Sequence, residues 1–154
     1  MAIGQGDLLA TPLQLADLYL QVANRGENIK PHFLSWIESY DGKVVKYYEP
    51  DVNKPADINV DLFDIVINGL SRVAVKGTAM EAFAGFPLNL YPVAAKTGTS
   101  EVLGKQNFSW FASFSPIQEP NFVVVVMVEE GGSGSGVAAK IAKQIYEYIY
   151  KINV

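Results

Sequence analysis

Residues 122–128 constrain the fold of this chain more than any other segment, because they are seven apolar residues in succession, five of them valine. Side chains alternate between the two faces of a strand, so a run without polar positions predicts a strand that is buried on both faces. We therefore expect residues 122–129 to form a central strand of a sheet. The preceding strand pattern, at residues 109–115, is joined to it by a short connection between two prolines, which predicts an antiparallel hairpin.

Helical patterns surround these strands, at residues 12–25, 60–76 and 137–152. Thr11 and Pro12 predict the start of the first helix, and its broad apolar coverage predicts that it is largely buried. Aromatic and β-branched residues on both sides of Asp41-Gly42 predict a separate hairpin. With a further strand at residues 93–101, the chain is of the α/β (α+β) class: an antiparallel sheet flanked by helices, in one domain over residues 1–154.

The composition excludes several kinds of partner. The net charge is −4 and the chain has no basic cluster, so we expect no nucleic-acid partner. Cysteine is absent, which excludes disulfides and thiolate metal sites, and no motif calls for a cofactor. The start lacks the pattern of a signal peptide, and no apolar run is long enough to span a bilayer, so we expect the chain as given to be soluble.

The segment Lys96-Thr97-Gly98-Thr99-Ser100 has the composition of an anion-binding edge at the end of a strand. The lysine supplies positive charge, the threonines supply hydroxyl donors, and the glycine lets a ligand approach the backbone closely.

Other features have simpler structural interpretations. Trp110 and Phe111 are better explained as sheet packing than as part of a substrate groove, and His32 as a structural or surface residue. Residues 131–136 lack the lysine of a phosphate-binding loop, which favours a flexible strand-to-helix turn. Glu129 and Glu130 are adjacent carboxylates at a strand end, and we expect them to be solvated and not to bind a metal.

Three blocks, in this order and with this spacing, resemble one family. They are Ile3–Gly6 with Thr11–Ala16, then Ala95–Glu101, and then Ser109–Pro116 with Asn121–Glu129. The chain is similar to the C-terminal part of the transpeptidase domain of class B penicillin-binding proteins, most like the elongation type. The resemblance implies part of the penicillin-binding transpeptidase and serine β-lactamase-like fold, whose five-stranded antiparallel sheet has helices on both faces.

The resemblance also implies an activity and a set of site residues. Family members cross-link peptidoglycan stem peptides by serine acyl transfer at D-Ala-D-Ala, and β-lactams stall them as acyl-enzymes. By this resemblance Lys96 and Thr99 are catalytic: Lys96 gives positive potential and the Thr99 N–H is an oxyanion-hole donor. Thr97, Gly98, Thr99 and Ser100 are implied to bind substrate, with the threonine hydroxyls on the terminal carboxylate.

Two further elements of that family are missing from this chain. No serine has a lysine three residues later, and no serine has an asparagine two residues later. We expect both elements upstream of Met1, in an N-terminal half of the domain that partners this chain, and we expect the chain alone to be inactive.

The missing half has consequences for partners and location. By itself the chain is expected to keep three strands and to self-associate through an exposed strand edge. The parent protein is expected outside the cytoplasmic membrane, anchored by an N-terminal helix. The alternative is a β-lactam-sensing receptor domain or a non-catalytic penicillin-binding module. The Ile3–Gly6 and Thr11–Ala16 blocks favour the peptidoglycan transpeptidase over this alternative.

Overall fold

The computed structural model describes residues 9–53 and 58–152. Its helices are α1 (Pro12–Ala23), α2 (Val60–Lys76) and α3 (Val137–Ile149). Its strands are β1 (Asn28–Ile29), β2 (Trp36–Glu38), β3 (Val44–Tyr47), β4 (Val52–Asn53), β5 (Ala94–Ser100), β6 (Phe108–Ser115) and β7 (Phe122–Val128). The expected helices and strands are therefore present, and α2 has the predicted bounds. None of the described helices is long and apolar enough to cross a membrane.

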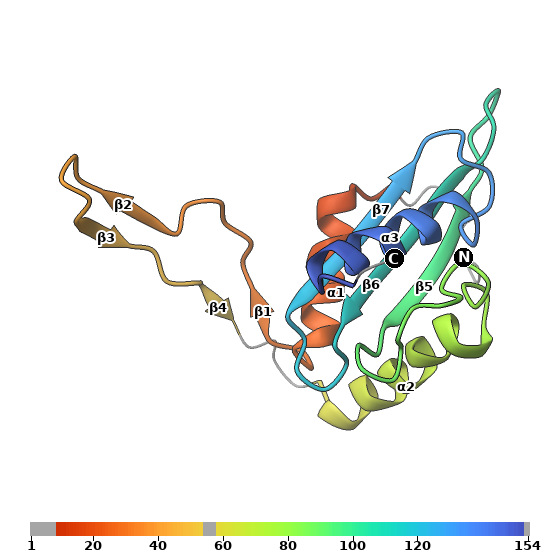
Figure 1. The fold of residues 1–154 in the computed structure, drawn as a ribbon, viewed down its shortest axis with the longest axis horizontal. Helices are drawn as coiled ribbons and strands as arrows, with labels where there is room; N and C mark the ends of the chain where they lie inside the picture. The colour runs from red at the N-terminus through yellow and green to blue at the C-terminus, as the bar shows by residue number, and fades with distance from the viewer. Residues whose placement is uncertain (1–8, 54–57, 153–154) are drawn as a thin grey trace.

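The main sheet has the strand order β5-β6-β7, with both pairs antiparallel. The expectation that the valine-rich strand is central is wrong for the described chain, because β6 lies between the other two (Figure 1). The central strand contains Phe111 and Phe114, both fully buried, and its serines are buried too. The outer edge of β7 has no partner strand among the described residues.

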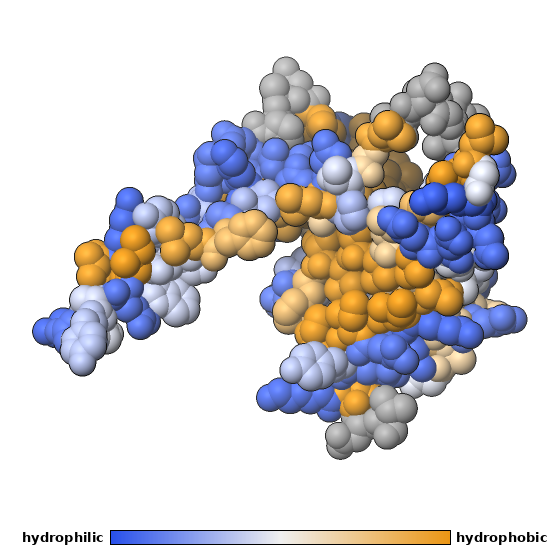
Figure 2. Space-filling view, turned by 90° about the horizontal axis from the view of Figure 1, so that it is seen from above, coloured by the Kyte–Doolittle hydropathy of each residue, from blue (hydrophilic) through white to orange (hydrophobic). Residues whose placement is uncertain are grey.

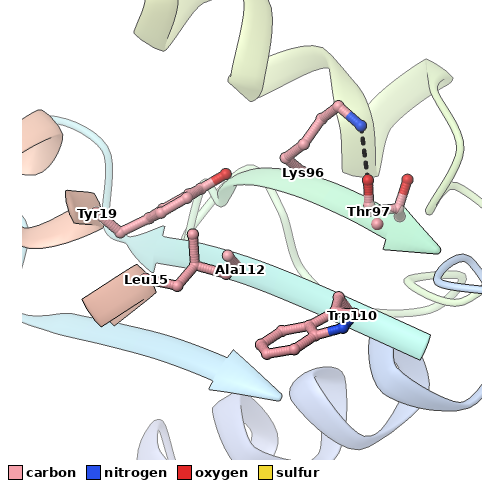
Figure 3. Close-up of a pocket in the computed structure, with 7 residues that line it drawn as sticks. Leu15, Tyr19, Lys96, Thr97, Trp110 and Ala112 are labelled. Carbon is pink, nitrogen blue, oxygen red and sulfur yellow. Dashed lines mark hydrogen bonds between the residues drawn. The ribbon is translucent and has the colours of Figure 1, made fainter. Parts of the chain in front are cut away.

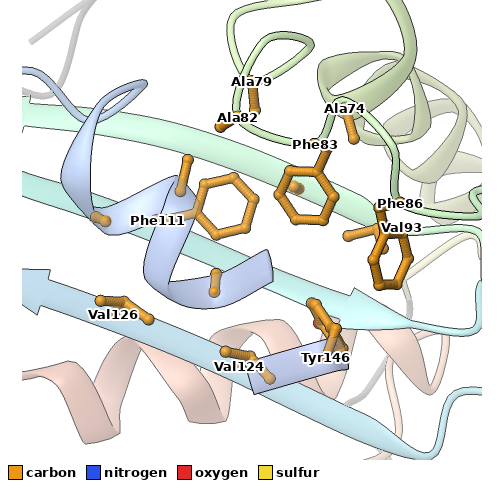
Figure 4. Packing of buried hydrophobic residues seen from close by; sticks show 14 residues of the cluster. Ala74, Ala79, Ala82, Phe83, Phe86, Val93, Phe111, Val124, Val126 and Tyr146 are labelled. Carbon is orange, nitrogen blue, oxygen red and sulfur yellow. The ribbon is translucent and has the colours of Figure 1, made fainter. Parts of the chain in front are cut away.

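Helices cover both faces of this sheet. On one face, α1 contributes Tyr19 and Ala23 to a cluster with Ala112 and Phe114. On the other face, α3 packs over a larger cluster in which aromatic rings meet (Figure 4). The ring of Phe83 stacks on Phe111 at a centroid distance of 5.6 Å. Helix α2 lies beside β5 and reaches both clusters, which fixes the strand that carries the lysine–threonine–glycine segment.

Helix α1 begins as predicted but is less buried than expected. Thr11 and Gln14 form a reciprocal capping box, in which each side chain bonds the other's backbone N–H. Only Tyr19 and Ala23 are buried, whereas Leu13 and Leu18 are more than half exposed, at 59% and 51%. The helix contacts β6, β7, β1 and α2, and these contacts leave Leu13 and Leu18 uncovered.

The predicted hairpin around Asp41-Gly42 is present and projects away from the rest of the molecule (Figure 1). Strands β2 and β3 pair antiparallel, and Gly42 takes a positive φ of 78° in the turn. At the base of this arm, β1 pairs with β4. Figure 2 shows apolar side chains along the arm and a broad apolar area on the body. Exposed apolar residues of the body include Leu18, Phe122 and Ile141.

Candidate active site

Strand β5 presents the predicted site residues on two faces. Lys96 and Gly98 pair with Ala112 and Trp110 on one face of the sheet, while Thr97 and Thr99 point to the other face. Lys96 is exposed, and its Nζ donates a hydrogen bond of 2.6 Å to the carbonyl oxygen of Thr97 (Figure 3). This hydrogen bond holds the ammonium group close to the strand.

A small cavity of about 100 Å³ lies beside Lys96, between β5, β6 and α1. It is lined by Leu15, Tyr19, Lys96, Thr97, Gly98, Trp110 and Ala112. Tyr19 reaches from α1 toward the side of the sheet from which Lys96 extends (Figure 3). Burial raises the pKa of Tyr19 to about 12, so its phenol keeps the proton at a pH where an exposed tyrosine ionises.

The hydroxyl of Thr97 has a partner that the sequence analysis did not find. Its Oγ1 lies 2.8 Å from Oγ1 of Thr78, which follows the end of α2. Thr97 itself is 9% exposed, whereas Thr78 is exposed. No sequence motif joins these residues, which are 19 positions apart.

The glycine-rich turn after β7 packs directly on β5. The Gly134 N–H donates to Oγ1 of Thr99 at 3.1 Å, and a Cβ added at Gly134 would collide with the Gly98 carbonyl. Glycine is needed at position 134 because the two backbones touch there.

Ser109 anchors the same turn from β6. It is fully buried, donates to the Ser133 carbonyl at 2.8 Å, and accepts from the Ala138 N–H at 3.3 Å in the first turn of α3. The sequence predicted a flexible strand-to-helix turn. The structure has a strand-to-helix turn here, with hydrogen bonds to both β5 and β6.

Trp110 and Phe111 have different roles. Phe111 is fully buried in the larger cluster, which confirms its interpretation as sheet packing. Trp110 lines the cavity beside Lys96, and its Nε1 donates to the Ser100 hydroxyl at 2.9 Å. Ser100 is therefore oriented by Trp110, for which the sequence favoured sheet packing over a place in a substrate groove.

The remaining sequence candidates lie elsewhere. His32 is exposed on the projecting arm, where its Nδ1 lies 3.0 Å from the Leu34 carbonyl oxygen. Within residues 9–53 and 58–152, no group of three or more histidine, cysteine or acidic side chains is arranged to hold a metal ion. The Ile3–Gly6 block lies outside the described residues.

An antiparallel sheet between helical layers, with a lysine–threonine–glycine segment on an outer strand, is the arrangement expected for part of a penicillin-binding transpeptidase fold. The family model "Penicillin binding protein transpeptidase domain" matches residues 1–147. The chain belongs to this family.

Relatives and solved structures agree with that assignment. The chain is 34% identical over 170 residues to the peptidoglycan D,D-transpeptidase MrdA of Haemophilus influenzae, with 96% of this chain and 25% of the relative covered. It is 29% identical over 154 residues to the peptidoglycan D,D-transpeptidase PbpA of Mycolicibacterium smegmatis, with 92% of this chain and 30% of the relative covered. These names agree with the elongation-type group that the sequence resembles.

Two solved structures show the same architecture. The imipenem acyl-enzyme complex of penicillin-binding protein A from M. tuberculosis matches with a TM-score of 0.83 at 25% identity, covering 97% of this chain and 33% of that one. PBP2 of Pseudomonas aeruginosa in complex with WCK 5153 matches with a TM-score of 0.73 at 32% identity, covering 99% of this chain and 33% of that one. The chain thus spans about a quarter to a third of the proteins that it matches.

Proposed function

We propose that residues 1–154 form the C-terminal portion of a serine D,D-transpeptidase domain, which cross-links peptidoglycan stem peptides and binds β-lactams. The observation that carries this proposal is the β5 site in a chain of this family. Lys96, Thr97 and Thr99 lie on β5, where Lys96 and Thr97 line a cavity. Two other segments contact this strand: Thr78 contacts Thr97, and the glycine-rich turn contacts Thr99. The nucleophilic serine with its lysine, and the Ser-x-Asn element, come from the remainder of the domain.

The proposed reaction is two-step acyl transfer. The serine oxygen attacks the carbonyl carbon between the two D-alanines, the C–N bond breaks, and the terminal D-alanine leaves after its amine takes a proton. The amine of a second stem peptide then attacks the ester, forms the new amide bond and returns the serine hydroxyl. A β-lactam acylates the same serine, but its amine stays attached after the ring opens, so the acyl-enzyme persists.

The residues of β5 take separate parts in this reaction. Lys96 supplies positive potential toward the substrate carboxylate and the serine, and the hydroxyls of Thr97 and Thr99 hydrogen-bond that carboxylate. The Thr99 N–H is one oxyanion-hole donor, and the amide of the serine is the other. Gly98 allows the substrate to lie close to the strand. Ser100, whose hydroxyl accepts a hydrogen bond from Trp110, is a further substrate-binding residue.

The partners of the chain follow from the same proposal. The remainder of the domain supplies the strand that pairs with the outer edge of β7, which has no described partner. In the absence of that remainder, this edge leads the chain to self-associate. The parent protein acts outside the cytoplasmic membrane and is anchored there by an N-terminal helix, where its peptidoglycan substrate lies.

The test compares two forms of the protein by intact mass after incubation with benzylpenicillin. We expect one adduct on the full-length protein and none on the 154-residue chain. In the full-length protein, Lys96→Ala should slow acylation about 100- to 1,000-fold, as loss of one preorganised electrostatic contact does in other acyl-transfer enzymes. Lys140→Ala, an exposed lysine on α3, is the matched control and should leave the rate unchanged. A stoichiometric adduct on the 154-residue chain, or an unchanged rate with Lys96→Ala, would contradict the proposal.

A further inference from the structure

The contact between Thr78 and Thr97 joins a residue of the candidate site to one outside every motif of the sequence. The two Oγ1 atoms lie 2.8 Å apart, a normal length for a hydrogen bond between hydroxyls. Either oxygen is able to donate in this geometry. A threonine hydroxyl has one hydrogen and two acceptor lone pairs, so the direction of this bond decides what Thr97 offers to a ligand.

The position of Thr78 is fixed from both sides. Gly77 ends α2, and a Cβ at Gly77 would lie 2.8 Å from the Val73 Cα, closer than real Cβ atoms approach a neighbour. After Thr78, the fully buried Ala79 donates its N–H to the Val73 carbonyl at 3.0 Å. The chain therefore folds back tightly on α2, and Thr78 lies in an anchored turn with its hydroxyl against β5.

We propose that Thr78 is a positioning residue for the proposed transpeptidase site, and that it acts by donating its hydroxyl hydrogen to Thr97. The inference rests on the proposed function, in which the Thr97 hydroxyl binds the substrate carboxylate. A carboxylate only accepts hydrogen bonds, so Thr97 must donate its one hydrogen to it. Oγ1 of Thr97 is then free to accept, and Thr78 is the hydroxyl at hydrogen-bond distance from it.

This arrangement has two effects on ligand binding. It holds the Thr97 hydrogen in the direction of the ligand, since the donation from Thr78 occupies a lone pair of Oγ1. It also strengthens the bond from Thr97 to the carboxylate, because hydrogen bonds in a chain polarise one another. The contact between Lys96 Nζ and the Thr97 carbonyl oxygen does not involve the Thr78 hydroxyl, so a change at Thr78 leaves the Lys96 contact in place.

The test measures acylation of the full-length protein by benzylpenicillin and by its methyl ester, which lacks the charged carboxylate. Thr78→Val removes the donor and keeps the branched shape. We expect it to slow acylation by the free acid about 2- to 10-fold, the range for a hydrogen bond between two uncharged groups, through weaker initial binding. With the methyl ester, the ratio of the wild-type rate to the variant rate should be close to one. Thr78→Ser should restore the rate with the free acid.

The controls separate positioning from a loss of folding. Ser71→Ala removes another hydroxyl at the surface of α2, one that bonds only the Asn68 carbonyl, and should leave both rates unchanged. Thr78→Ala serves as a second variant if Thr78→Val fails to fold. Three results would overturn the proposal. Thr78→Val slows acylation by the free acid and by the methyl ester equally, it leaves acylation by the free acid unchanged, or Thr78→Ser does not restore the rate.

Failure of this inference is distinguishable from failure of the proposed function. If Thr97→Val slows acylation by the free acid while Thr78→Val does not, the proposed function stands and only the role of Thr78 is wrong. If the wild-type full-length protein takes up no benzylpenicillin, both are wrong.

Discussion

A pair of buried hydroxyls shows how a single residue contributes to this fold. Ser113 and Tyr146 are both fully buried, and their oxygens lie 2.9 Å apart. Ser113 uses its one hydrogen on the Val124 carbonyl at 3.1 Å, so Tyr146 must be the donor to Ser113. The two hydroxyls are therefore not equivalent, because the serine both donates and accepts while the tyrosine only donates.

We expect Ser113→Ala to be more destabilising than Tyr146→Phe. The alanine leaves the Tyr146 O–H buried without an acceptor, which costs about 1 to 3 kcal/mol, whereas the phenylalanine removes one hydrogen bond worth about 1 kcal/mol. Urea unfolding at neutral pH measures both free energies of unfolding, with Ser71→Ala as a control at the surface. Equal losses for the two variants would contradict the assigned direction of the bond.

At the scale of elements, the sequence predicts what depends on near neighbours and misses what depends on distant ones. The starts of α1 and α2 follow from Thr11 and Asn59, which cap the first turn of each helix. The place of β7 was predicted wrongly because a run of valines indicates burial but not which strands lie beside it. The contacts of Thr78 with Thr97, and of Gly134 with Thr99, are likewise set by the folded chain. The lysine–threonine–glycine segment could be found because it is continuous in the sequence.

The outer edge of β7, which has no partner strand in the part of the chain that the structure describes, leads to a prediction about association. We expect the 154-residue chain alone to sediment above its 16.8 kDa mass over a concentration series, because an apolar edge strand pairs with another chain. Met127→Lys should reduce this association, since Met127 is half-buried, lies outside both core clusters and is on this strand. Met80→Lys makes the same change in charge at an exposed site in the segment after α2, outside β7, and should have no effect. A monomer at all concentrations would refute the proposed edge contact.

Across the whole molecule, each of the two hydrophobic clusters that pack on the main sheet contains a buried tyrosine. Tyr19 belongs to the cluster under α1, and Tyr146 to the cluster under α3. Burial raises the pKa of Tyr19 to about 12, and it raises the pKa of Tyr146 more than the Ser113 hydrogen bond lowers it. Both faces of the sheet therefore depend on a phenol that must stay protonated in the folded state.

This dependence makes the stability of the whole fold fall at alkaline pH. An unfolded tyrosine ionises near pH 10, so below that pH both states keep the proton and the stabilising contribution is fully present. Between pH 10 and about 12, the unfolded chain loses the Tyr19 proton while the folded chain keeps it, and the contribution of Tyr19 to stability falls by about 1.4 kcal/mol per pH unit. Tyr19→Phe should remove that part of the decline in urea unfolding measured from pH 9 to 12. Tyr148→Phe, at a tyrosine that is 86% exposed, should keep the wild-type slope. If Tyr19→Phe also keeps the wild-type slope, the Tyr19 hydroxyl ionises in the folded state as readily as in the unfolded chain, and the α1 cluster is more open to water than its packing indicates.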